Sequence, residues 1–262
     1  MAILQTKTPK VSVVIVNYHT DLLVLNLLSQ IGDSGEIEII LVDNSSAPFI
    51  ESELPKFQSL VYLFQNKNRG FSGANKVGIK QAKGEWVFLL NSDTLTSGED
   101  ILKLVKICES EGVSAGAPRL VNEDGTGQQS VGYFDPPHKG AINWLLARPR
   151  FVDISAHENT RVDFATGAAL LIKKTVFEKV GLLDEKSFFM YFEDIDFCYR
   201  LYKDKISILR VPSIKITHFG GKSADQNIQE RNTNYTNARN AYIKKHRGSF
   251  ILFLNNVFKL FV

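Results

Sequence analysis

Apolar residues in the first half of the chain form short continuous runs separated by segments of helical character. Four runs are rich in β-branched or aromatic residues, as expected of strands buried on both faces: 11–16, 37–42, 60–64 and 86–90. Residues 21–29 and 73–82 are predicted to be helices. Residues 101–108 place apolar side chains at the i, i+3, i+4, i+7 spacing of an amphipathic helix. This alternation predicts an α/β fold whose sheet is mostly parallel.

The second half of the chain is less regular. Gly, Pro and polar turn residues predict a long loop region over 125–161. Beyond it, the pattern predicts a helix over 193–202 and three strands: 164–172, 206–211 and 214–217. Residues 249–262 are strongly apolar but short, and they follow the basic residues 244–247. This segment fits equally an amphipathic helix at a membrane interface and a helix docked on the core or in a homodimer interface.

Composition narrows the class of protein. Of 262 residues, 44% are hydrophobic and 23% charged, which is ordinary for a soluble globular protein. The net charge of +3 is too small to indicate a dedicated nucleic-acid binder. The first residues lack the apolar core of a signal peptide, and no run has the length of a membrane span, so we expect a cytoplasmic protein. Cys108 and Cys198 are then reduced core residues, and the sequons at Asn44 and Asn234 are chance matches.

Polar groups follow three of the predicted strands. Asp43 follows the second strand, residues 68–75 follow the third, and residues 91–93 follow the fourth. Ligands of open parallel sheets bind outside the carboxyl ends of the strands, so these groups are expected to face one crevice. Turns are polar in any protein, and this alone could explain a polar group after one strand. It is a weaker explanation for polar groups after three strands. Asp93 could hold a divalent cation there, or could simply cap the next helix.

The segment 68–75 reads NRGFSGAN and opens a helix. Its glycines would let the backbone approach a ligand, and Arg69 could pair with phosphate at the helix N-terminus. The spacing is not that of a dinucleotide fingerprint, and no glycine follows the first strand, which argues against an oxidoreductase. Gly221-Lys222-Ser223 resembles the end of a P-loop, but Ile216 occupies the place of the first glycine and excludes that motif.

The segment 188–200 reads FFMYFEDIDFCYR, in which aromatic residues lead directly into Glu193 and Asp194. Acidic residues at a helix start are stabilised by the helix dipole, and Asp196 with Arg200 has the i, i+4 spacing of an ordinary surface ion pair. Capping does not explain the aromatic residues before the two carboxylates. Sugars stack on aromatic rings, and a neighbouring carboxylate could take a proton from an attacking hydroxyl.

The segments VSVVIVNY, LVDNSS, NRGFSGAN, a strand ending in NSD, TGAALLIKKTVFEKVGLLDE, FFMYFEDIDFCYR and THFGG follow one another in this order. Over roughly residues 11–221 the chain thereby resembles glycosyltransferase family 2, of the GT-A fold, and especially its bacterial rhamnosyltransferase-like branch. The resemblance implies a GT-A domain over 1–224, with a nucleotide-binding half at about 1–95 and an acceptor-binding half at about 96–224. Residues 225–262 would form a C-terminal helical extension that associates with membrane or dimerises.

The resemblance also implies roles for individual residues. Asp194 would be the general base, and Asp93 with His218 would hold Mg²⁺ or Mn²⁺. Asn91 stands where the family's D-x-D motif has its first Asp. The residues expected to bind the nucleotide-sugar are Asn17, Asp43 (at the nucleobase), Asn68, Arg69, Gly70, Asn75, Asn91, Ser92 and Gly167. Those expected at the acceptor are Tyr191, Phe192 and Glu193. We expect the helix N-terminus to lower the pKa of Asp194, with Glu193 and Asp196 opposing that shift.

The implied reaction is an inverting, metal-dependent transfer onto a hydroxyl of a glycan or lipid-linked glycan, with no nucleic acid involved. The favoured donor is dTDP-rhamnose, with UDP-linked sugars next. Surface polysaccharide or O-antigen assembly is the family's usual setting, at the inner face of the membrane. The alternative is a non-catalytic nucleotide-sugar or glycan-binding relative.

Overall fold

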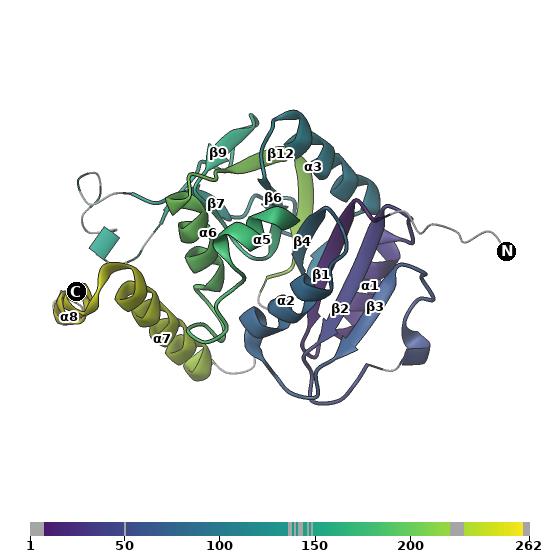
Figure 1. Cartoon of the computed structure of the whole chain (residues 1–262), viewed down its shortest axis with the longest axis horizontal. Helices are drawn as coiled ribbons and strands as arrows, with labels where there is room; N and C mark the ends of the chain where they lie inside the picture. Colours follow the sequence, from purple (N-terminus) through teal and green to yellow (C-terminus); the bar gives the residue numbers. More distant parts are fainter. Residues whose placement is uncertain are drawn as a thin grey trace.

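A computed structural model of the chain describes residues 8–258 apart from 50, 136, 137, 139, 141–143, 146, 148 and 221–227. Within these residues a nine-stranded sheet lies between two layers of helices (Figure 1). Its first four strands are parallel and run in the order β3-β2-β1-β4. Their bounds agree closely with the predicted runs: β1 (Val11–Asn17), β2 (Ile37–Asp43), β3 (Leu60–Phe64) and β4 (Trp86–Asn91).

The rest of the sheet mixes parallel and antiparallel pairs. Strand β11 (Ala169–Lys173) is antiparallel to both β4 and β6 (Ala115–Val121). Strand β12 (Ile208–His218) then runs parallel to β6 and carries two short antiparallel partners, β5 (Thr94–Leu95) and β9 (Thr160–Val162). The α/β architecture is therefore confirmed, and β11 makes the sheet mixed.

Successive side chains along each strand point to opposite faces of the sheet and pack against the two helical layers. Val13 and Ile15 of β1 pack with α1 (Asp21–Ile31) and α3 (Gly98–Ser110), whereas Val14 packs with the layer on the other face. That second layer consists of α2 (Gly70–Gln81), α5 (Lys174–Val180) and α6 (Glu193–Lys203). Because both faces are covered, the parallel strands are apolar at nearly every position.

Several boundaries differ from the sequence pattern. Residues 164–172 are not one strand: β10 (Phe164–Ala165) joins a small sheet with β7 (Val131–Tyr133) and β8 (Arg150–Phe151), while β11 belongs to the main sheet. The predicted strands 206–211 and 214–217 are a single strand, β12, with a register shift between Val211 and Lys215. Helix α2 begins at Gly70, three residues before the predicted start.

Two helices extend the chain beyond the sheet and confirm a C-terminal helical extension. Helix α7 (Ile228–Arg247) packs its Tyr242 and Ile243 against Phe188 and Phe192, and α8 (Ser249–Phe258) follows it. Figure 1 shows both helices on the side of the molecule opposite the N-terminal strands. The predicted boundary at 224/225 and the rejected P-loop triplet 221–223 lie outside the described residues. None of the helices in the described part of the chain is long and apolar enough to cross a membrane.

The two cysteines are buried and free, as predicted. Burial raises the pKa of Cys108 to about 12, and burial likewise raises that of Cys198. Both thiols therefore stay protonated and act as small core residues.

Candidate active site

Two adjoining cavities lie at the carboxyl ends of the strands, where β1 and β4 are neighbours and the strand order reverses. The larger cavity has a volume of about 310 Å³ and the smaller about 60 Å³. They share four lining residues: Phe71, Asn91, Asp93 and Met190. Most of the predicted site residues line them. Gly167, Tyr191, Glu193, Asp194 and His218 line the larger cavity, and Asn68, Gly70 and Ser92 the smaller.

Asn17 and Asp43, at the ends of β1 and β2, form a buried framework beneath this site. Asn17 Nδ2 donates to Asp43 Oδ1 at 3.2 Å, and Asn17 Oδ1 accepts from the backbone N–H of Thr20. Asp43 Oδ2 accepts from the backbone N–H of Phe49 at 2.9 Å and from Tyr62 Oη at 2.7 Å. Neither residue is among those that line the two cavities. Both therefore fix the loops after β1 and β2, and a direct contact of Asp43 with a nucleobase stays a prediction.

The loop before α2 is tied to two distant segments. Asn44 Nδ2 donates to Asn68 Oδ1 at 2.8 Å, and Asn44 Oδ1 accepts from the backbone N–H of Arg69 at 2.9 Å. The backbone N–H of Phe71 donates to the carbonyl of Phe189 at 2.9 Å. Gly70 lies at φ +68, and a Cβ there would stand 2.1 Å from that same carbonyl oxygen. Asn44, which the sequence marked as part of a chance sequon, thus supports the loop.

Three further predicted residues, besides Asn17 and Asp43, do not line the cavities. Asn75 is buried within α2, where Nδ2 donates to the carbonyl of Phe71. Arg69 precedes α2, and its Nε is buried without a hydrogen-bond partner among the described residues. Phe192 is buried, and its ring contacts Tyr235 and Tyr242 of α7 rather than the site.

Asp93 and His218 come together although 125 residues separate them, because β5 pairs with the end of β12. His218 Nε2 lies 3.4 Å from Asp93 Oδ1, and the Asp93 carbonyl accepts from the backbone N–H of Phe219. On the other side of the ring, Nδ1 lies 2.9 Å from Gln128 Oε1. Gln128 also lines the larger cavity and had no signal in the sequence.

These residues fit a hard divalent cation. Asp93 and His218 offer oxygen and nitrogen ligands, and Asn91 has a buried Oδ1 with no hydrogen-bond partner in the described structure. Asn91 and Asp93 line both cavities. Within the described residues, no three His, Cys, Asp or Glu side chains form a metal-binding cluster. A cation here would therefore need ligands from substrate or water as well.

Asp194 and Glu193 stand at the start of α6, after two residues with left-handed backbone. Tyr191 has φ 71 and Phe192 has φ 62, an arrangement that costs energy for bulky residues and is typical of functional sites. Asp194 Oδ2 accepts from the backbone N–H of Gly167 at 2.8 Å, and Oδ1 accepts from the N–H of Ile195. The break between β10 and β11 at Gly167 thus places a backbone donor against the predicted base.

Burial dominates the electrostatics of this pair. Burial raises the pKa of Asp194, with the N–H groups of Gly167 and Ile195 opposing the shift. The N–H of Ile195 in the first turn of α6 lowers the pKa as expected, but burial outweighs it, so the net shift is upward. Burial, and then the charge of Asp194, raise the pKa of Glu193 well above its ordinary value. Glu193 Oε2 is buried without a described hydrogen-bond partner, which fits a neutral acid better than a carboxylate.

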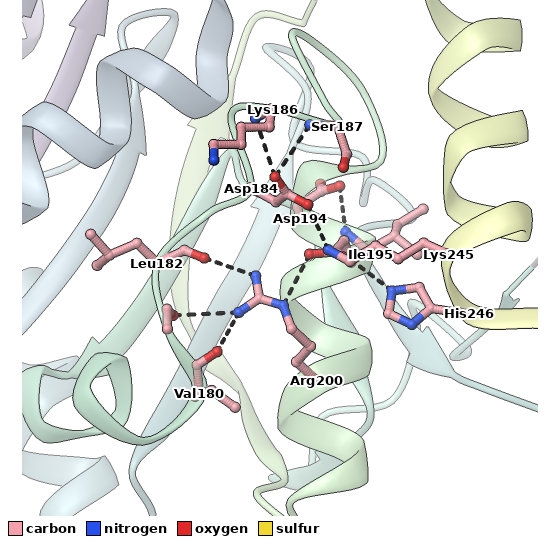
Figure 2. A network of polar contacts seen from close by, with 12 residues as sticks. Val180, Leu182, Asp184, Lys186, Ser187, Asp194, Ile195, Arg200, Lys245 and His246 are labelled. Carbon is pink, nitrogen blue, oxygen red and sulfur yellow. Dashed lines mark hydrogen bonds and ion pairs between the residues drawn. The ribbon is translucent and has the colours of Figure 1, made fainter.

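The i, i+4 spacing of Asp196 and Arg200 predicted a surface ion pair, but the pair is largely buried. The Asp196 side chain is fully buried and contacts Arg200 Nε at 3.0 Å, Lys245 Nζ at 2.7 Å and His246 Nε2 at 2.7 Å. Figure 2 shows Arg200 reaching the carbonyls of Val180 and Leu182, with Lys245 and His246 of α7 on the other side. These contacts lock α6, and with it Asp194, to α7.

Comparisons with known proteins agree with this geometry. Residues 12–181 match the model of "Glycosyl transferase family 2". The low-salt glycan biosynthesis hexosyltransferase Agl10 of Haloferax volcanii is 34% identical over 82% of this chain and 68% of its own length. The dTDP-rhamnosyl transferase RfbF of Shigella flexneri is 24% identical over 92% and 82%, and the rhamnosyltransferase WbbL of Escherichia coli 23% over 80% and 83%.

Solved structures are alike in fold. The mannosyltransferase PcManGT of Pyrobaculum calidifontis, in complex with GDP-Man and Mn²⁺, has a TM-score of 0.59 at 14% identity. GalNAc-T7, solved with UDP, GalNAc and Mn²⁺, has a TM-score of 0.58 at 17% identity. The matches cover 90% and 81% of this chain but only 64% and 44% of those chains. With its family-model match, its relatives and this sheet, the chain belongs to glycosyl transferase family 2 and has the GT-A fold.

Proposed function

We propose that this glycosyltransferase moves a hexose, with L-rhamnose from dTDP-rhamnose as the favoured donor, onto a hydroxyl of a growing surface glycan with inversion. Two relatives that cover most of the chain are named rhamnosyl transferases, and one of them carries dTDP in its name. The relative with 34% identity is named a hexosyltransferase of glycan biosynthesis, which supports the sugar class. UDP-linked sugars are the second choice of donor.

The observation that carries the proposal is the position of Asp194. Its carboxylate lines the same cavity as Asp93 and His218, and the Gly167 N–H holds it. Each of its oxygens accepts one backbone hydrogen bond and keeps lone-pair capacity for a substrate proton. Burial raises its pKa, which makes it a stronger base than an exposed Asp.

In the proposed reaction Asp194 accepts the proton of the acceptor hydroxyl. The acceptor oxygen forms a bond to the anomeric carbon from the face opposite the diphosphate, and the bond from that carbon to the diphosphate oxygen breaks. Asp93, His218 and the Asn91 amide oxygen would hold Mg²⁺ or Mn²⁺. When bound, that cation would neutralise the charge of the departing nucleoside diphosphate. Glu193, held neutral, would donate a hydrogen bond to the acceptor rather than compete as a base.

The donor's nucleoside diphosphate is proposed to occupy the smaller cavity, beside Asn68, Gly70 and Ser92. Buried Asn17 and Asp43 would position the loops that contact it. Asn75 would act through the first turn of α2, where it bonds the Phe71 carbonyl, and Arg69 through the loop that its backbone N–H ties to Asn44. Tyr191 would face the acceptor. Phe192 would support the acceptor site from beneath, because its ring packs against α7.

The test combines binding with turnover. A thermal-shift panel of dTDP, UDP, GDP and NAD, each with and without Mn²⁺, is expected to show a metal-dependent shift with dTDP or UDP. A ligand at a hundred times its Kd raises the apparent free energy of unfolding by roughly 2.7 kcal/mol. Asp194→Asn should keep that shift and lose transfer from dTDP-rhamnose by about 10²–10⁴-fold. Near-normal turnover in Asp194→Asn would overturn the assigned base. Nucleotide binding without transfer of any sugar by the unchanged protein would favour a non-catalytic relative.

We also propose a cytoplasmic setting at the inner face of the membrane, with α8 as the contact. Phe250 and Phe253 of α8 are 70% and 62% exposed, while Asn255 is buried and bonds the carbonyl of Leu145. One side of α8 is therefore docked on the protein and the other presents apolar rings beside the basic end of α7. A homodimer through the same rings is the second candidate.

A further inference from the structure

The loop 122–128 forms a chain of hydrogen bonds that ends on His218. Thr126 Oγ1 donates to Asp124 Oδ1 at 2.6 Å, and Asn122 Nδ2 donates to Thr126 Oγ1 at 2.8 Å. Gln128 Nε2 then donates to Asn122 Oδ1 at 2.6 Å, and Gln128 Oε1 meets His218 Nδ1 at 2.9 Å. The chain runs from an exposed loop to the wall of the larger cavity.

Asp124 determines which atom donates and which accepts in every hydrogen bond of this series. An ionised carboxylate only accepts, so the single hydroxyl proton of Thr126 is committed to Asp124 and the Thr126 oxygen must accept. Asn122 therefore presents its NH₂ to Thr126 and its oxygen to Gln128. The Gln128 NH₂ faces two acceptors, Asn122 Oδ1 and the carbonyl of His218 at 2.7 Å, which leaves Oε1 facing the ring. His218 must then carry a hydrogen on Nδ1.

This tautomer leaves the Nε2 atom of His218 without a hydrogen, so that its lone pair is available to bind a metal ion. With its hydrogen on Nδ1, neutral His218 directs the Nε2 lone pair toward Asp93 Oδ1 across 3.4 Å. Two acceptor atoms at that distance repel one another unless a positive charge neutralises them. The hydrogen bond on Nδ1 also fixes the plane of the ring, as outer partners of metal-bound histidines commonly do.

We propose that residues Asp124, Thr126, Asn122 and Gln128 are a relay that selects the Nδ1–H tautomer of His218 and thereby prepares it, with Asp93, to bind the divalent cation. Gln128 is a positioning residue, since it acts through His218. The proposal rests on the metal site of the proposed function. It goes beyond that function by assigning a purpose to a loop that contributes no ligand of its own.

The decisive variant is Gln128→Met, which keeps the length of the side chain and removes its hydrogen bonds. Gln30→Met, on the exposed face of α1, is the matched control. Long-range ¹H–¹⁵N spectra at pH about 8, above the ordinary imidazole pKa of about 6.5, report the tautomer of His218, assigned by difference from His218→Asn. Mn²⁺ affinity in the presence of dTDP, measured by electron paramagnetic resonance, reports the cation site.

We expect Nδ1–H in the unchanged protein and in Gln30→Met, and a shift toward Nε2–H in Gln128→Met. Mn²⁺ affinity should fall about 10- to 100-fold in Gln128→Met alone. Thr126→Val, remote from the cavity, should shift both readouts in the same direction by less, and it keeps the test open if Gln128→Met unfolds. An unchanged tautomer, or an affinity within twofold, would overturn the relay. Failure of the unchanged protein to bind Mn²⁺ would count against the proposed function, while the tautomer would still test the relay.

Discussion

The backbone N–H of Gly167 donates to Oδ2 of Asp194 at 2.8 Å, which joins the break between β10 and β11 to the first turn of α6. A Cβ at residue 167 would lie 3.0 Å from the nearest atom of the Phe71 ring and 3.5 Å from Asp194 Cβ. The glycine therefore lets Phe71 and Asp194 share one wall of the larger cavity.

Gly167→Ala should displace Asp194 more than it unfolds the protein. The added methyl must push the Phe71 ring or the start of α6, and a misplacement of about 1 Å can cost about 100-fold in rate. We expect kcat to fall at least tenfold, with overpacking costing about 1–3 kcal/mol in urea unfolding. The double variant Gly167→Ala with Phe71→Leu should recover part of the lost kcat. Its kcat is compared with that of Phe71→Leu alone. No recovery would place the damage elsewhere than at the ring.

Glu193→Gln should stabilise the protein increasingly as pH rises. The folded-state pKa of Glu193 is raised, so above the ordinary Glu pKa of about 4.3 the folded chain binds more protons than the unfolded chain and loses stability as pH increases. Gln imitates the neutral acid and removes this dependence. Urea unfolding from pH 4 to pH 8 should show equal stability at the acid end and a growing advantage for the variant above it. A constant difference across that range would contradict a neutral, buried Glu193.

The pattern of apolar runs was sufficient to predict the first four strands because strands buried on both faces need no alternation. The same pattern could not show that 164–172 divides between two sheets, since Phe164 and Leu170 are equally apolar. Gly167 was singled out from the family resemblance, but the structural reason for it is a contact with α6, 27 residues later. Local periodicity carries no record of such contacts.

The polar residues of the site were predictable where a strand end or a helix start marked them, as with Asp93 and Asp194. Gln128 lies in a loop whose polar residues look alike in sequence, and Asn44 follows β2 but supports the loop before α2 through a contact 24 residues later. Asp196 was misplaced for a related reason. Its i, i+4 spacing to Arg200 is typical of a surface pair, and only α7, about 50 residues further on, makes it a buried ion cluster.

Gly70→Ala should destabilise the protein more than Gly125→Ala. Both glycines have positive φ, +68 and +81, so left-handed backbone should lower the stability of each alanine variant by about 1–2 kcal/mol. Only residue 70 also places a methyl against the Phe189 carbonyl, which should add about 1–3 kcal/mol. Urea unfolding of the two variants compares them directly. Equal losses would mean that the loop before α2 moves without cost.

Asp196→Asn should cost about 3–5 kcal/mol, because it removes the buried charge that pairs with Arg200 and with Lys245, which keeps Asp184, and that accepts from His246. Asp204→Asn, at an exposed pair 3.9 Å from Lys179, should cost less than about 1 kcal/mol.

The cost of Asp196→Asn should also depend on pH. Burial alone would raise the pKa of Asp196, but the contacts with His246, Lys245 and Arg200 hold it below its ordinary value. Its contribution is therefore complete above about pH 4 and is lost as pH falls through the lowered pKa. Urea unfolding should show the two proteins converging in strong acid. A difference that persists there would indicate packing rather than charge.

Phe250→Ser combined with Phe253→Ser should weaken binding to vesicles that contain an anionic lipid. Among the described side chains of α8, these two rings are the large apolar groups that are exposed. Burying one Phe side chain is worth about 1.5–3 kcal/mol, so we expect at least a tenfold loss of partitioning in a sedimentation assay. Leu22→Ser is the matched control, because Leu22 is 82% exposed on α1, which covers the sheet face opposite α6. Light scattering separates the two proposed roles of α8. A halved mass in the double variant, with vesicle binding unchanged, would assign the rings to a homodimer and contradict a membrane contact.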